Sequence, residues 1–265
     1  MKKMIRNLFA LALAVSMLLG MAMAETTEAT QPVATAHKAA NIVLDGSLDE
    51  WNLNDPIVLS EVTQLVRDGH FWNGPDDLSA KVYIAWDEEY FYIGADVTED
   101  SVFGAIEMLP LDGEDNFQLY ISTNPADDPA RTEYATNDFK VFLIMDGEYW
   151  DTAFDRSMVP KDNRQRFISQ GMDGGENVLG DGYQVAAVQT TTGFIYEARI
   201  AWSCFSNRNI PVYTPAVGDT VNFDFLITDI SYPCPGTEYI PQIAWTGTAA
   251  IDVNPSQWGR LTFAE

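Results

Sequence analysis

The sequence predicts an all-β fold, a distorted antiparallel β-sandwich of the jelly-roll type. Short segments in which apolar and polar residues alternate recur along the chain, while no long segment has the period of an amphipathic helix. Asp-Gly and Thr-Gly pairs, which favour turns, separate these segments. Many short strands joined by turns are typical of two packed sheets.

Eight segments have the alternating pattern of a half-buried strand. In chain order they are residues 80–86, 90–97, 116–122, 139–145, 183–189, 194–200, 220–229 and 259–263. Only Asp87-Glu88-Glu89 separates the first two segments, which predicts a hairpin. One short helix or turn is expected at residues 202–207.

The first 24 residues have the three parts of a bacterial secretory signal peptide. Lys2, Lys3 and Arg6 precede the apolar run LFALALAVSMLLG, and Ala22–Ala24 form a cleavage site of small residues. The run is short for a membrane-spanning helix, and no cysteine follows the cleavage site to accept a lipid. We therefore expect residues 1–24 to be removed and the mature chain to be secreted.

The remaining chain is expected to hold one domain behind a leader. Residues 25–40 are rich in Thr and Ala and lack an apolar period, which predicts a flexible segment. Residues 41–265 then form the sandwich, because about 225 residues fill one large β-domain and bury a substantial core. No later segment is apolar enough to enter a membrane.

The chain is strongly acidic, with 15 Lys+Arg residues against 39 Asp+Glu residues. The signal peptide contains three of the bases and no acid, so the mature chain has 12 bases against 39 acids and a net charge of −27. Such a field repels nucleic acids and anionic membranes, and it suits neutral ligands or divalent cations. The oligomeric state is left open.

The two cysteines, Cys204 and Cys234, both lie near predicted loops. Export permits a disulfide, but two separate thiols fit the sequence equally well. A zinc site of the Cys/His type is not expected, because no CxxC motif is present and His37 and His70 are the only histidines.

Several aromatic residues lie outside the predicted strands, in the segments HFWNGPDD, GEYWD and ISYPCPGTEY. Among these residues are Trp72, Trp150 and Tyr239. Large rings in loops favour a binding surface, on which the C–H faces of sugar rings could stack. Rings that close the ends of a sandwich are the alternative for each of them.

The motifs from residue 41 to residue 264 resemble, in order, those of the family 9 carbohydrate-binding modules. VLDGSLDEW is similar to the family's IDGxxDExW, and AKVYIAWDEEYFYIGADVTED to AxVxxxWDxxYLYxxxxVxD. EDNFQLYIS, YEARIAW and VNFDFLITD are similar to xDSVEIFID, VExxIxW and GFxxxVND. NPSQWGRLTF resembles the closing DPxxFGxLxL. The resemblance implies that DGSLDEW is the turn that opens the domain, with Trp51 packed inward, rather than a catalytic or metal loop.

The resemblance implies a sandwich that binds sugars or polysaccharide ends. In the family two tryptophans hold a sugar ring, but the matching positions fall near Leu111 or Asp112, and near Asp252, and none of these is aromatic. An acidic family contact falls at Gln118 and an arginine at Lys140, and both replacements can still form hydrogen bonds. Alternation turns both side chains away from their apolar neighbours, so we expect both to face solvent.

The stacking surface must then come from other rings, for which Trp72, Trp150 and Tyr239 are the candidates. The family also contains structural calcium, and an acidic exported chain suits a hard cation with oxygen ligands. The segment DVTED supplies Asp96, Glu99 and Asp100 as candidate ligands.

Two other functions remain open. A glycoside hydrolase needs two carboxylates about 5 to 10 Å apart, and an acid-rich chain supplies many such pairs. We do not expect an enzyme, however, because the family itself supplies no catalytic site and the chain leaves no room for a further domain. A surface-adhesion or protein-interaction sandwich with a degenerate sugar site is favoured by the missing tryptophans.

Overall fold

The computed structural model describes residues 31–100, 115–144, 167–170, 176–178, 182–206, 211–229 and 240–265. These ranges contain fourteen strands and three short 3-10 helices. The strands are β1 (Val33–Lys38), β2 (Ile57–Leu59), β3 (Leu65–Arg67), β4 (Leu78–Trp86), β5 (Tyr90–Glu99), β6 (Asn116–Ser122), β7 (Asp138–Ile144), β8 (Phe167–Gln170), β9 (Glu176–Val178), β10 (Tyr183–Gln189), β11 (Gly193–Ala201), β12 (Thr220–Thr228), β13 (Gln242–Ala244) and β14 (Gly259–Phe263). The 3-10 helices are η1 (Val62–Gln64), η6 (Trp202–Cys204) and η7 (Pro255–Gln257).

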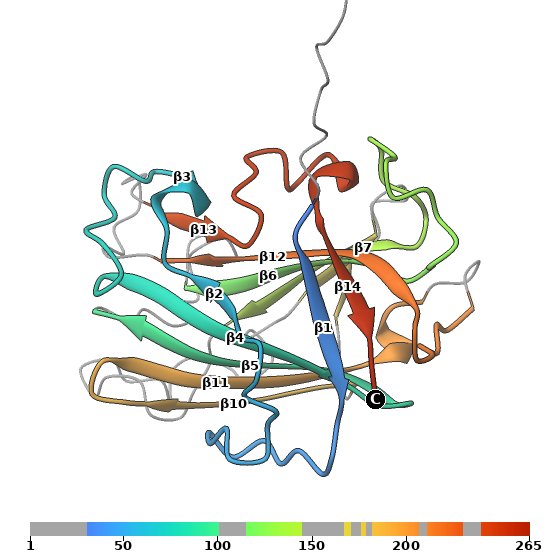
Figure 1. The fold of residues 1–265 in the computed structure, drawn as a ribbon, viewed down its shortest axis with the longest axis horizontal. Helices are drawn as coiled ribbons and strands as arrows, with labels where there is room; N and C mark the ends of the chain where they lie inside the picture. The colour runs from blue at the N-terminus through green and yellow to red at the C-terminus, as the bar shows by residue number, and fades with distance from the viewer. Residues whose placement is uncertain are drawn as a thin grey trace, which may run out of the picture. The chain divides into compact units, whose positions relative to one another are not determined.

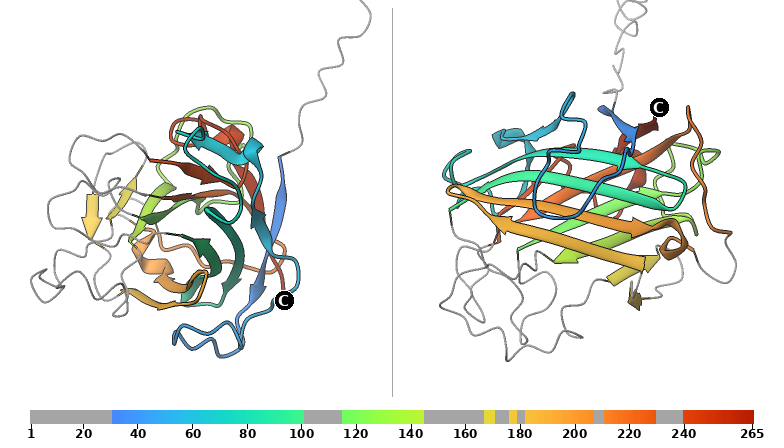
Figure 2. Two further views of the ribbon diagram at one scale, coloured as in Figure 1. Left: turned by 90° about the vertical axis from the view of Figure 1, so that its left-hand side faces the viewer. Right: turned by 90° about the horizontal axis from the view of Figure 1, so that it is seen from below.

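The strands form two layers that face each other, as the sequence predicts (Figures 1 and 2). Sheet A has the order β1-β14-β12-β6-β7-β8-β9, with β13 beside the second half of β12 and β3 beside β13. Sheet B has the order β10-β11-β5-β4-β1, with β2 beside β4. All eight predicted strands are present, and the hairpin predicted at Asp87-Glu88-Glu89 joins β4 to β5.

The main core lies between the two sheets and is built from alternate residues of each strand. On β5 these are Phe91, Ile93, Ala95 and Val97, and on β12 they are Val221, Phe223, Phe225 and Ile227, all at most 1% exposed. Burying a side chain of the size of Ile or Phe stabilises the fold by roughly 1.5–3 kcal/mol. The period-two pattern in the sequence is therefore the inner face of the sandwich.

The predicted opening turn is confirmed, and a buried carboxylate holds it. The side chain of Glu197 on β11 accepts hydrogen bonds from the backbone N–H groups of Asp45 (3.0 Å) and Gly46 (2.6 Å) and from Nε1 of Trp51 (2.8 Å). Burial raises the pKa of Glu197, and the three donors oppose that rise. Trp51 is buried as expected, at 6% exposed, but it packs in a small cluster on the outer side of sheet B rather than in the main core. A Cβ on Gly94 would lie 2.8 Å from its ring.

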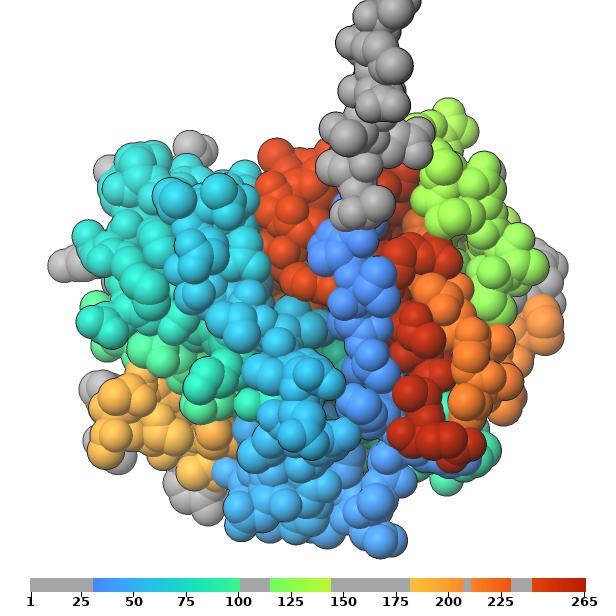
Figure 3. Space-filling view, viewed as in Figure 1, coloured from blue at the N-terminus to red at the C-terminus, as the bar shows by residue number. Residues whose placement is uncertain are grey.

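The expectation of a flexible leader over residues 25–40 is wrong for its second half, because Val33–Lys38 forms β1. β1 pairs in parallel with β14 through residues 33–36 and with β4 through His37 and Lys38, so it joins the two sheets. Figure 3 shows it as a stripe between their neighbouring segments. Ala34 and Ala36 face the core. Alanine is depleted in strands, so the composition of this segment resembles that of a flexible leader although the segment forms a strand.

None of the helices within the described ranges is long and apolar enough to cross a membrane. Cys204 is half-buried, and burial raises the pKa of its thiol. Its possible partner Cys234 lies outside the described residues, so the question of a disulfide stays open.

Candidate functional site

The outward face of sheet A is the side of β6, β7 and β12 that points away from the main core. Side chains from all three strands meet there because the register places Tyr120 beside Lys140 on one side and beside Asp224 on the other. Gln118 lies two residues before Tyr120 and therefore faces the same way. The two positions matched to family contacts, Gln118 and Lys140, thus lie on one face of adjacent strands.

A polar cluster links Gln118, Tyr120, Lys140 and Asp252. The hydroxyl of Tyr120 lies 2.7 Å from Oδ1 of Asp252 and 3.1 Å from Oε1 of Gln118. Nζ of Lys140 forms an ion pair with the same Oδ1 atom of Asp252. Asp252 comes from the segment before η7, so a residue distant in sequence completes the cluster.

Lys140 and Asp252 are the part of this cluster that solvent reaches. Their side chains are 20% and 52% exposed, whereas Tyr120 is 0% exposed. The Lys140 ammonium also lies 5.2 Å from the ring centroid of Tyr120 and 4.7 Å from that of Phe142, within the range of cation–π attraction. Burial, followed by the nearby Asp252 carboxylate, raises the pKa of Tyr120 well above its ordinary value, so the phenol keeps its proton and donates it.

The expectation that Gln118 faces solvent is wrong, because Gln118 is only 2% exposed. Its Nε2 donates to Oγ1 of Thr228 at 3.3 Å, and Nε2 of Gln242 donates to the same oxygen at 3.1 Å. Every residue of β6 is buried, so both faces of this central strand are covered. Gln118 therefore supports the cluster from within rather than offering its amide to a ligand.

A small apolar cluster covers part of the outward face. It consists of Tyr120, Leu226, Ala244, Ile251 and Trp258, with Val66 and Tyr134 packed against it. Nε1 of Trp258 donates to the backbone oxygen of Ile251 at 2.8 Å. Ile251 precedes Asp252 directly, so this packing fixes the turn that presents the Asp252 carboxylate.

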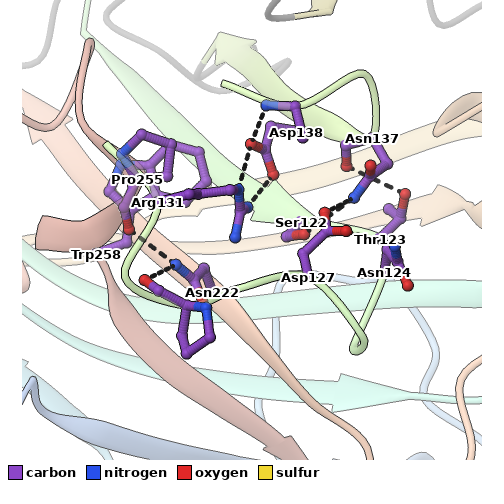
Figure 4. Close-up of polar contacts among 12 residues, drawn as sticks. Ser122, Thr123, Asn124, Asp127, Arg131, Asn137, Asp138, Asn222, Pro255 and Trp258 are labelled. Carbon is purple, nitrogen blue, oxygen red and sulfur yellow. Dashed lines mark hydrogen bonds and ion pairs between the residues drawn. The ribbon is translucent and has the colours of Figure 1, made fainter. Parts of the chain in front are cut away.

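Two loops are tied together at the Ser122 end of the same face (Figure 4). Arg131 forms a two-bond ion pair with Asp138, whose side chain is fully buried. In one of the two bonds, Nε of Arg131 lies 3.1 Å from Oδ2 of Asp138. Nδ2 of Asn222 on β12 donates to the carbonyl oxygens of Pro129 (3.0 Å) and Pro255 (2.9 Å). These bonds join the β6–β7 connection to η7, the helix that follows the Asp252 turn.

The predicted stacking rings have different positions. Trp72 packs on the main core, and its Nε1 donates to the backbone oxygen of Leu78 at 2.8 Å, so it anchors the loop before β4. The outward cluster of sheet A, by contrast, belongs to a separate apolar group. Trp150 and Tyr239 lie outside the described residues.

The predicted calcium ligands are not brought together. Asp96 and Glu99 are an odd number of residues apart on β5, so their side chains lie on opposite faces of the strand. Asp96 and Asp100 are exposed, and Glu99 is 4% exposed. Among the residues that the structure describes, no group of three or more His, Cys, Asp or Glu side chains is placed to hold a metal ion.

Sequence reasoning missed Tyr120 as a member of the site, and it marked Asp252 only as a lost aromatic position. The signal for Tyr120 was present, because the alternation that selected Gln118 also selects the residue two positions later. No sequence signal pairs Asp252 with Lys140, since loop packing brings them together across 112 residues.

A family model described as "Carbohydrate family 9 binding domain-like" matches residues 44–265. Endo-1,4-beta-xylanase A of Thermoanaerobacterium saccharolyticum is 28% identical over 188 residues, which cover 71% of this chain and 12% of that protein. Exoglucanase XynX of Acetivibrio thermocellus is 27% identical over 188 residues, which cover 71% of this chain and 13% of that protein. The chain thus corresponds to a small part of each relative.

Solved structures share the fold at low identity. A carbohydrate binding module family 9 from Caldicellulosiruptor kristjanssonii in complex with cellotriose matches with a TM-score of 0.54 and 16% identity, covering 88% of this chain and 93% of that one. The module from the same organism in complex with glucose gives 0.51 and 17%, covering 87% and 95%. A putative carbohydrate-binding protein from Bacteroides uniformis gives 0.54 and 12%, covering 88% and 100%.

Proposed function

The chain belongs to the carbohydrate family 9 binding domain-like family, and from this premise we propose that it binds neutral sugars on the outward face of sheet A, through Lys140 and Asp252. One observation carries the proposal. Two positions matched to family contacts from the sequence, Gln118 and Lys140, converge with Tyr120 on one hydrogen-bonded cluster that solvent reaches.

The sugar class follows from the neighbours and from charge. The solved modules with the same fold were bound to cellotriose and to glucose, which makes glucose and β-glucan ends the first ligands to test. A mature net charge of −27 disfavours acidic polysaccharides, because a polyanion would have to approach a chain of its own sign.

We further propose that the protein is exported and that it binds without catalysis. The N-terminal 24 residues have the pattern of a signal peptide. Within the polar cluster the exposed carboxylate of Asp252 is already engaged by Lys140 and Tyr120. Such a carboxylate is suited to holding hydroxyl groups rather than to attacking a glycosidic bond.

Isothermal titration calorimetry with cellotriose and glucose tests the proposal. We expect saturable binding to the wild type and a loss of roughly 1.5–3 kcal/mol for Lys140→Ala, because a hydrogen bond to a charged group is removed. That loss corresponds to roughly a 10- to 150-fold weaker affinity. Lys81→Ala, at an exposed position on the outer side of sheet B, is the matched control and should bind like the wild type.

Equal binding by wild type and Lys140→Ala would place the site elsewhere. Absence of binding across a glycan panel would contradict the sugar-binding proposal and favour an adhesion role. Release of reducing ends from cellotriose over time would contradict the proposal of binding without catalysis.

A further inference from the structure

The turn that holds Asp252 is fixed before any ligand arrives. Val253 N–H and Asn254 N–H both donate to the carbonyl oxygen of Ala250, at 3.0 and 2.9 Å. Ile251 is 2% exposed, and its backbone oxygen accepts the indole N–H of Trp258. A carboxylate on a preorganised turn loses little conformational entropy when it binds.

The two oxygens of Asp252 have different surroundings. Among the residues that the structure describes, the carboxylate accepts hydrogen bonds from Tyr120 Oη and Lys140 Nζ, and both reach Oδ1. The side chain is 52% exposed, which leaves Oδ2 as an acceptor that a ligand can reach. An ionised carboxylate accepts hydrogen bonds only, so Oδ2 selects a donor such as a hydroxyl.

Lys140 lies beside this acceptor as a donor. Its ammonium has three protons, the ion pair with Asp252 uses one direction, and its side chain is 20% exposed. Attraction to the rings of Tyr120 and Phe142 holds the ammonium in place. A charged acceptor and a charged donor on neighbouring residues therefore present a fixed pair to solvent.

We propose that Asp252 and Lys140 together recognise two adjacent hydroxyls of a neutral sugar, so that Asp252 is a specificity-determining residue of this site. One hydroxyl donates to Asp252 Oδ2, and its neighbour accepts from Lys140 Nζ. The inference rests on the proposed function. In it, the polar pair of Asp252 and Lys140 supplies the selectivity that a stacking ring would otherwise supply. A uronic acid is disfavoured, because its carboxylate would meet Asp252.

The test combines Asp252→Asn with glucose and its monodeoxy analogues, each of which lacks one hydroxyl. For the wild type, removal of either of two neighbouring hydroxyls should weaken affinity about tenfold or more, since each bond involves a charged group. For Asp252→Asn, glucose should bind about tenfold more weakly, and the penalty for removing one of those two hydroxyls should shrink. That coupling is a double-mutant cycle between Asp252 and one ligand hydroxyl.

Asp49→Asn is the charge-matched control, because Asp49 is exposed in the opening turn that packs against sheet B. It should leave both the affinity for glucose and the pattern of the deoxy analogues unchanged. The ratio of glucuronate to glucose affinity should rise in Asp252→Asn and stay constant in Asp49→Asn.

Several results would overturn the inference. One such result is that the wild type binds glucose and Asp252→Asn binds it as tightly or more tightly. Asp252 would then only position Lys140 or neutralise its charge. Deoxy penalties that are equal in both variants would lead to the same conclusion. If the wild type bound no glycan at all, the proposed function would fail first, and the inference with it.

Discussion

At the scale of single residues, the outward face of sheet A depends on polar groups that are buried behind the exposed pair. Asp224 on β12 is 0% exposed and lies beside Tyr120 in the register. It accepts hydrogen bonds from the hydroxyl of Thr246 and from the backbone N–H of Phe225. Burial outweighs these donors and raises the pKa of Asp224 to about 7.

The pKa of Asp224 predicts that stability falls as the pH rises. A carboxyl whose pKa is higher in the folded than in the unfolded state favours folding while it stays protonated. Its contribution is fully present below about pH 4 and is lost as the pH rises through about 7. Between pH 5 and pH 8 the free energy of unfolding should fall by roughly 2–3 kcal/mol on account of this group.

Urea unfolding of the wild type and of Asp224→Asn at several pH values measures this contribution. The amide cannot ionise and can still accept the hydrogen bond from Thr246, so the difference between the two curves isolates Asp224. We expect the wild type to lose stability relative to the variant as the pH rises from 5 to 8. Parallel curves over that range would contradict the raised pKa.

At the scale of strands, the sequence predicts the strands with strong alternation of apolar and polar residues. It misses the short strands, which form because a neighbouring strand pairs with them. β5 and β12 have large apolar residues at every second position, so their strands and their inner faces were both predictable. β2, β3 and β13 have three residues each, too few to show a period. They are strands only because β4, β12 and each other supply the partners.

The candidate site was predictable to the same extent. Alternation predicts that Gln118 and Lys140 each point away from their apolar neighbours, but that they share one face of adjacent strands depends on a register that no local pattern specifies. That Gln118 is buried does not follow, because it bonds to Thr228 on β12, 110 residues away, and Gln242 on β13 donates to the same hydroxyl oxygen. Burial of an outward face is a tertiary property that no local pattern contains.

β1 provides a prediction at this scale. A variant that starts at Asn41 lacks β1 and leaves the edges of β4 and β14 unpaired, whereas a variant that starts at Gln31 retains the strand. Hydrogen bonds contribute about 0.5–1.5 kcal/mol each, so loss of six register pairs should cost several kcal/mol, less the entropy that the freed chain regains. Thermal melts of the two variants measure the difference.

We expect the shorter variant to melt well below the longer one, by several degrees for each 2 kcal/mol lost. Exposed strand edges should also make it prone to aggregation. Equal melting temperatures would mean that the domain is complete from residue 41, as the composition of the leader suggests.

At the scale of the whole molecule, the excess of acidic residues favours solubility and favours the binding of cations over anions. The net charge of −24 of the full chain opposes compaction through self-repulsion, and bound cations relieve that repulsion. Ion pairs within the described part of the chain offset little of it. They are Lys38–Glu88, Arg67–Asp68, Arg131–Asp138 and Lys140–Asp252.

The final prediction is that calcium stabilises the folded protein. Because the chain is strongly charged, the test needs a control that separates calcium binding from screening by salt. An ion that binds only the folded state stabilises it by about 2.7 kcal/mol at a concentration one hundred times Kd, but any salt also screens a strongly charged chain. Melting temperatures should be measured in EDTA and in millimolar calcium at one ionic strength, with magnesium as the comparison ion. We expect calcium to raise the melting temperature more than magnesium does, because it accepts six to eight oxygen ligands in flexible geometry. Equal melting temperatures in EDTA and in calcium would contradict a structural calcium site.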